Sequence, residues 1–229
     1  MKHLNRIVFL EKIEQKTGRR SGTGGKTIKP RFRFHVVMED GEEFTLSCRQ
    51  AAGMTLAEGM EIPPEDYAKI MESFRISCMQ RCGNLLGTRD YSVLRLKKKL
   101  TEAGYPPRVI DDAIHKLKEA GYLDDSRYAQ NYVRYHLQDR SRLRIMRDLA
   151  ERGISDEDAE AAFEAVGEEE DTDSLQRQQI KRLLEKRGYH SNTATYQDRQ
   201  KIMGFLHRKG YPADLIRQMT GSSNDFDVI

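Results

Sequence analysis

The chain has 229 residues, of which 39 are Lys or Arg and 36 are Asp or Glu, giving a formal net charge of +3. Apolar residues make up 38% of the sequence, below the roughly 45–50% usual for compact domains, which favours an elongated, repeat-like body over one large central core. No apolar run approaches the roughly 18–20 residues of a membrane span, and three cysteines cannot form a fully paired disulfide framework. We therefore expect a soluble, cytoplasmic protein.

The first 62 residues are predicted to form a β-rich segment. Residues 7–13 are apolar enough for a short strand, and residues 31–38 alternate apolar and polar side chains as a half-buried strand does. The Asp-Gly pair at residues 40–41 is typical of a tight hairpin turn, after which the alternation resumes. These features predict a small β-hairpin segment, in which residues 17–29, rich in Gly and basic residues, form a mobile loop.

The sequence from residue 63 onward is dominated by Leu, Ala, Glu, Lys and Arg and is punctuated by Gly, which predicts helices almost to the end. Three segments share one pattern, in which a Leu precedes a Gly by four residues and an apolar position follows that Gly by six. The three glycines are Gly104, Gly153 and Gly210. Each is predicted to end a helix in the left-handed conformation, so that a short turn leads into the next helix.

A further helix precedes each of these helical hairpins, so the sequence predicts three tandem three-helix repeats. The repeats are expected to cover residues 63–123, 124–167 and 168–229, the last with an acidic linker and a loose C-terminal tail. The predicted fold is therefore mainly α, with three tandem three-helix repeats forming an elongated curved body that is preceded by a small N-terminal β-hairpin segment.

No arrangement of residues predicts catalysis, a cofactor or a metal. The GTGGKT run at residues 22–27 lacks the first Gly of a phosphate-binding P-loop and is followed by a predicted strand. Cys78 and Cys82 could share a helix face, but no further ligands with iron–sulfur or zinc spacing accompany them, so two buried apolar cysteines are favoured. Asp124 and Asp125 are interpreted as residues that cap a helix. We expect a protein that is not an enzyme.

One stretch, from Lys98 to Arg134, carries the most specific order of features. A Leu–Gly helical hairpin is followed there by a helix with apolar anchors, then by Gly-Tyr-Leu-Asp-Asp at residues 121–125 and by Tyr-Ala at residues 128–129. This order resembles the RecX family, bacterial regulators of the RecA recombinase. The other repeats and the N-terminal segment match more loosely, and Ser141-Arg142 stands where the family often has Gly-Pro.

The resemblance implies a non-enzymatic regulator that binds the RecA–single-stranded DNA filament. Such a regulator modulates, chiefly by inhibition, the assembly of the filament and its ATPase, strand-exchange and coprotease activities. Weak direct contact with DNA is implied as well, and we expect a monomer that does not bind membranes. The alternative is a DNA- or RNA-binding protein of helix-turn-helix type, because residues 149–163 are predicted as two helices joined by a short turn. The helix after Gly153 is acidic, which weighs against this alternative.

Cations recur at equivalent positions of the repeats. A helical wheel places apolar side chains on one face of the helix before each Gly and charged side chains opposite. Aligning the repeats on their Leu residues places Arg95, Arg144 and Lys201 at one position and Lys98 and Arg147 at another. The third repeat has Arg208 where the first two have Glu, and two more cations lie in the turn before the second repeat's helix. The predicted partner- and nucleic-acid-binding residues are Arg95, Lys98, Arg140, Arg142, Arg144, Arg147, Lys201 and Arg208.

The alternative interpretation of these cations is a solvated face. Because exposed charges contribute little to folding, reversing Arg144 and Arg147 to Glu is expected to leave stability nearly unchanged while weakening filament inhibition. Residues 156–173 carry ten acidic residues and no Lys or Arg. That stretch could mimic DNA or repel it, although a solvated helix and linker is the simpler interpretation.

Overall fold

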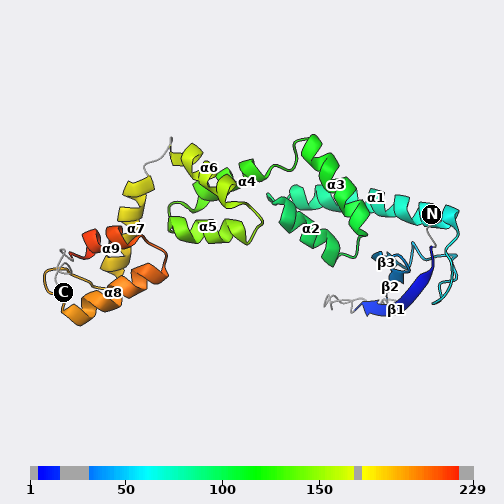
Figure 1. Ribbon diagram of the computed structural model, residues 1–229, viewed down its shortest axis with the longest axis horizontal. Helices are drawn as coiled ribbons and strands as arrows, with labels where there is room; N and C mark the ends of the chain where they lie inside the picture. Colours follow the sequence, from blue (N-terminus) through cyan, green and yellow to red (C-terminus); the bar gives the residue numbers. More distant parts are fainter. Residues whose placement is uncertain (1–4, 16–30, 168–171, 222–229) are drawn as a thin grey trace, which may run out of the picture. The chain divides into compact units, whose positions relative to one another are not determined.

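The computed structural model describes residues 5–15, 31–167 and 172–221. The chain divides into two units, Met1–Leu123 and Asp124–Ile229, each described by itself below. The described residues form three strands and nine helices, which confirms the predicted mainly α fold with an N-terminal β segment (Figure 1). The loop and the C-terminal tail that the sequence predicts lie outside the described residues, and the elongated curved body stays a prediction.

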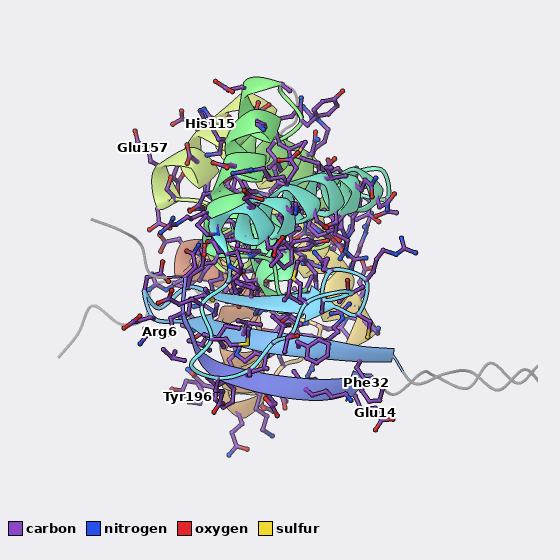
Figure 2. All side chains as sticks on the ribbon, turned by 90° about the vertical axis from the view of Figure 1, so that its right-hand side faces the viewer. Arg6, Glu14, Phe32, His115, Glu157 and Tyr196 are labelled. Carbon is purple, nitrogen blue, oxygen red and sulfur yellow. The ribbon has the colours of Figure 1, made fainter. Side chains whose placement is uncertain are left out.

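The N-terminal strands form an antiparallel sheet in the order β1-β2-β3, so the predicted hairpin is part of a three-stranded sheet. The strands are β1 (Ile7–Gln15), β2 (Arg31–Met38) and β3 (Glu43–Ser47). Figure 2 shows Glu14 and Phe32 together at one end of the sheet, where they are register partners. At the other end Arg6 pairs with Glu61, with 3.1 Å between Nη2 and Oε1.

The first three-helix repeat covers one face of this sheet. It consists of α1 (Pro64–Leu86), α2 (Val93–Glu102) and α3 (Pro107–Glu119). Apolar side chains from the inner face of the sheet and from all three helices form a single hydrophobic core. Cys78 and Cys82 lie within it, fully buried and not joined by a disulfide, as the sequence predicted.

The second unit contains the second repeat, α4–α6, and the third repeat, α7–α9. Their helices are α4 (Asp125–His136), α5 (Arg142–Ala150), α6 (Asp156–Gly167), α7 (Thr172–Lys186), α8 (Tyr196–Arg208) and α9 (Ala213–Thr220). Each repeat has its own core, one around Leu149 and Phe163 and the other around Ile180 and Leu206. None of the helices in the described ranges is long and apolar enough to cross a bilayer.

The predicted helix ends are confirmed. Gly104, Gly153 and Gly210 have φ of +85°, +81° and +88°, a conformation that Gly adopts at no steric cost. Asp124 caps α4 as predicted, since its carboxylate accepts a hydrogen bond of 3.0 Å from the backbone N–H of Arg127. The repeated pattern in the sequence therefore reflects one backbone turn that occurs in all three repeats.

Candidate functional site: a cationic pocket between two repeats

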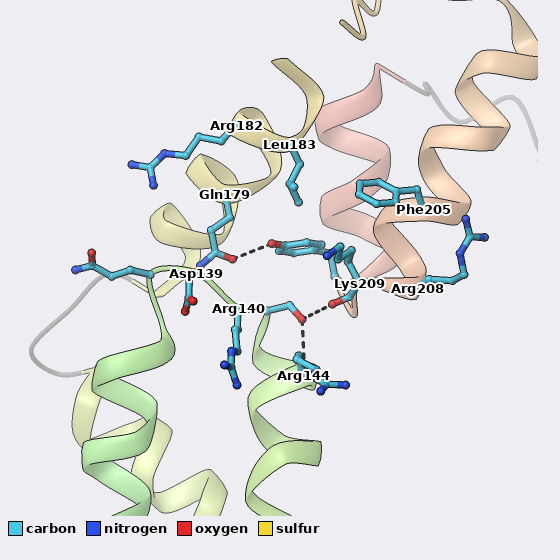
Figure 3. Close-up of a pocket in the computed structure, with 12 residues that line it drawn as sticks. Asp139, Arg140, Arg144, Gln179, Arg182, Leu183, Phe205, Arg208 and Lys209 are labelled. Atoms are coloured by element: carbon cyan, nitrogen blue, oxygen red, sulfur yellow. Dashed lines mark hydrogen bonds between the residues drawn. The ribbon is translucent and has the colours of Figure 1, made fainter. Parts of the chain in front are cut away.

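A pocket of about 860 Å³ lies where the second and third repeats meet (Figure 3). We call it the junction pocket. Its cationic lining residues are Arg140, Arg144, Arg182, Arg208 and Lys209. Among the described residues that line it, Asp139 is the one acid. The pocket therefore has a strongly positive lining, to which both repeats contribute.

The N-terminus of α5 holds the two repeats together at this pocket. Ser141 caps α5, because its Oγ accepts the backbone N–H of Arg144 at 3.3 Å. The same Oγ donates a hydrogen bond of 2.7 Å to the carbonyl oxygen of Lys209. The turn after α8 approaches so closely that a Cβ on Gly210 would lie 2.8 Å from Ser141 Oγ. Gly210 is thus required both for its backbone conformation and for this contact.

A second, buried contact between the repeats passes through Gln179 on α7. Its Nε2 donates a hydrogen bond of 2.5 Å to the carbonyl oxygen of Leu137, and its Oε1 accepts one of 2.9 Å from the hydroxyl of Tyr211. Burial, and to a lesser extent the charge of Asp139, raises the pKa of Tyr211 to about 12. The hydroxyl therefore stays protonated at neutral pH and keeps its role as the donor.

Asp148 is a buried carboxylate that holds two of the lining cations in place. Its side chain is 4% exposed and pairs with Arg140 Nη1 at 2.7 Å and with Arg144 Nε at 3.1 Å. The hydroxyl of Tyr132 donates a further hydrogen bond of 3.2 Å to it. Arg140 and Arg144 are therefore fixed by the protein itself, which bears on the stability expected for their variants.

Sequence reasoning missed Asp148 as a structural residue because charged residues surround it. The signal was present in the spacing, since Asp148 lies three residues after Ile145 and directly before Leu149, and both are fully buried. On a helix this spacing places all three side chains on the packed face. The same reasoning missed Arg182 and Lys209, which lie outside the helix positions that were compared between repeats.

The other predicted residues of the second unit lie elsewhere. Arg142 pairs with Glu160 and lies over the ring of Phe163, 4.4 Å from its centroid. Arg142 and Arg147 line a different pocket, of about 640 Å³, at the same junction. Lys201 is exposed on α8 and lines neither pocket. Of the eight predicted residues, the junction pocket therefore brings together Arg140, Arg144 and Arg208.

The two predicted residues of the first repeat, Arg95 and Lys98, are exposed on α2 in the unit Met1–Leu123. The neighbouring Lys97 and Lys99 pair with carboxylates of the same repeat. A common binding track that runs from Arg95 and Lys98 to the cations of the later repeats stays a prediction.

The chemistry of the junction pocket is that of an anion-binding site. Arg182, Arg208 and Lys209 form no ion pair with any described residue, so their charges are available to a ligand. In the described ranges, no group of three or more His, Cys, Asp and Glu side chains is placed to hold a metal ion.

Comparison with known families gives three adjacent matches. Residues 78–117, 124–162 and 175–219 match the first, second and third three-helix domains of RecX. The regulatory protein RecX of Trichlorobacter lovleyi is 31% identical over 146 residues, which cover 62% of this chain and 92% of the relative. That of Amycolatopsis mediterranei is 32% identical over 160 residues, covering 68% and 83%.

Two solved structures are similar in fold. A crystal structure of regulatory protein RecX has a TM-score of 0.59 and 21% identity, covering 95% of this chain and 99% of the other. The crystal structure of RecX from Lactobacillus salivarius has a TM-score of 0.57 and 25% identity, covering 66% and 96%. The junction pocket lies between the segments that match the second and third domains.

Proposed function

This chain belongs to the RecX family of regulatory proteins, and on that premise we propose that it is a non-enzymatic regulator of the RecA recombinase. It binds the RecA filament on single-stranded DNA and inhibits the assembly of the filament and its ATPase, strand-exchange and coprotease activities. The observation that carries this proposal is the match to all three RecX domains, in order, along one chain.

The charge distribution supports an anionic or filamentous partner. A protein built from repeats suits a partner that repeats, and the unpaired cations of the junction pocket offer contacts to phosphates or carboxylates. Weak direct contact with DNA is part of this proposal. A formal net charge of only +3 argues against strong binding to DNA that is independent of its sequence.

The geometry of the second repeat weighs against a base-reading helix-turn-helix. In α6 the apolar side of the helix, including Ala159 and Phe163, is buried, so the side left to solvent carries acidic residues. Its first turn consists of Asp156, Glu157 and Asp158. A recognition helix with that face would be repelled by phosphates and would lack the Arg, Asn or Gln side chains that read bases.

Hydrolysis of ATP by RecA on single-stranded DNA tests the proposal. We expect the purified protein, at stoichiometric ratios to RecA, to slow the hydrolysis. The same protein is titrated onto the same DNA without RecA, which separates binding to the filament from competition for bare DNA. No effect on hydrolysis contradicts the proposal, and inhibition only at concentrations that cover the bare DNA favours the nucleic-acid-binding alternative.

A further inference from the structure

The cations of the junction pocket outnumber the carboxylates that face them. Five cations and two carboxylates, Asp139 on the lining and the buried Asp148, leave an excess of three positive charges. Asp148 forms ion pairs with Arg140 and Arg144. The unbalanced charge therefore resides on the third repeat, on the residues Arg182, Arg208 and Lys209.

These three side chains are spread around the pocket. Figure 3 shows Arg182 and Arg208 extending on opposite sides of it, with Lys209 between them. Cations on opposite sides of a pocket suit a ligand with several negative charges along its length better than they suit a single small ion.

The type of cation indicates the type of anion. Four of the five are Arg, whose planar guanidinium forms paired hydrogen bonds with phosphate oxygens and is more weakly hydrated than an ammonium group. The volume of about 860 Å³ falls within the roughly 300–1,000 Å³ of small-molecule sites. We propose that the junction pocket binds a chain of phosphate groups, supplied either by a nucleoside triphosphate or by the backbone of a single-stranded nucleic acid.

Such a ligand would also hold the two repeats together. Both repeats contribute cations to the pocket, Arg140 and Arg144 from the second and Arg182, Arg208 and Lys209 from the third. An anion between them is attracted to both repeats. Because it binds only the assembled junction, it stabilises the unit Asp124–Ile229 against unfolding.

Binding of a fluorescent oligothymidylate, followed by anisotropy, tests the site in the full-length protein. The variant removes two unpaired charges by Arg182→Gln and Arg208→Gln. The control, Lys181→Gln with Lys186→Gln, removes two exposed charges of α7 that lie outside the pocket. We expect the variant to bind at least about tenfold more weakly, with a salt slope smaller by roughly 1.4 for two lost phosphate contacts. The control should bind nearly as the wild type does.

Competition with ATP and with pyrophosphate distinguishes the two sources. Displacement of the oligonucleotide by either, together with a raised melting temperature in wild type and control but not in the variant, assigns the site to free nucleotides. Variant-sensitive oligonucleotide binding without displacement assigns it to the nucleic-acid backbone. Equal binding by variant and wild type, or no binding of any probe by the wild type, overturns the inference.

The inference rests on the proposed function only in expecting a partner that carries phosphates. The two are separated by measuring RecA ATP hydrolysis with the same proteins. If the wild type inhibits RecA while the variant binds the oligonucleotide as tightly as the wild type does, the phosphate site is wrong and the proposed function stands. If the wild type binds through the pocket but does not inhibit RecA, the proposed function fails alone.

Discussion

The backbone N–H of Thr45, in β3, donates a hydrogen bond of 2.8 Å to the carbonyl oxygen of Gly104, in the turn between α2 and α3. The contact joins the sheet to the first repeat. A Cβ on Gly104 would lie 2.4 Å from that of Thr45, closer than two carbon atoms that are not bonded to each other can approach. The turn that ends α2 therefore also packs against β3.

Replacing Gly104 by Ala should destabilise the protein by more than about 2 kcal/mol, because it adds strain at positive φ to a clash with β3. The measurement is the midpoint of urea unfolding. The control is Gly83→Ala on α1, where a Cβ meets nothing within 4 Å, and where the change should stabilise by up to about 1 kcal/mol. Equal effects at both sites would contradict this account of the turn.

Ser141→Ala should lower the free energy of unfolding by about 1–2 kcal/mol, because it removes both the cap of α5 and the hydrogen bond to Lys209. Thr195→Ala is the matched control, because Thr195 caps the exposed N-terminus of α8 within its own repeat. Thermal unfolding of both variants would separate the contribution of the helix cap from that of the contact between the repeats. A loss no larger at Ser141 than at Thr195 would mean that the contact between the repeats adds nothing to stability.

Arg144 and Arg147 should respond differently to reversal, which corrects the expectation from sequence that neither affects stability. Arg144→Glu places a carboxylate against the buried Asp148. The free energy of unfolding should fall by about 1–2 kcal/mol. This value is modest because the Arg144 side chain is 57% exposed, so that solvent screens its charge. Arg147→Glu should stay within about 0.5 kcal/mol of the wild type. Chemical denaturation of each single variant checks the difference, and equal stabilities would contradict it.

Stability should fall as the solution becomes mildly acidic, because of His136. Burial, followed by the charge of Arg140, lowers the pKa of His136 below its ordinary value of 6.5. The unfolded chain therefore binds a proton more readily than the folded one between the lowered pKa and 6.5, so stability is lost as the pH falls through that range. The groups that act on the imidazole are Asp139, Arg140, Asp148 and the rings of Tyr132 and Tyr135.

Unfolding of the wild type and of His136→Gln, measured at pH values from about 7.5 down to about 5, checks this linkage. The variant should lose less stability than the wild type over the same interval. Parallel pH profiles would show that other groups cause the change.

Local patterns were enough to predict most of the secondary structure. The alternation of apolar and polar residues predicted β2 and β3. The Leu–Gly spacing located three helix ends, at each of which the Gly has a positive φ. These features depend on residues close together in the sequence. The contact between Thr45 and Gly104 joins positions far apart, and no periodic pattern encodes it.

The junction pocket could be predicted only in part for the same reason. Arg140 and Arg144 lie in a conspicuous basic stretch, and Arg208 followed from the alignment of the repeats. Arg182, however, reaches the pocket only through the packing of α7 against the second repeat, which Gln179 fixes by its hydrogen bond to Leu137. The pairing with Asp148 likewise depends on which side of α5 is packed.

The turn that contains the helix-ending Gly packs against a different element in each unit. At Gly210 it contacts the N-terminus of α5, which belongs to the preceding repeat. At Gly104 it contacts β3. The sheet thus fills, at the first repeat, the position that a preceding repeat fills at the third. In an array of repeats each docking surface is covered by a neighbouring element. At the first repeat that element is a sheet, a different kind of secondary structure from the helix that covers the corresponding turn of the third.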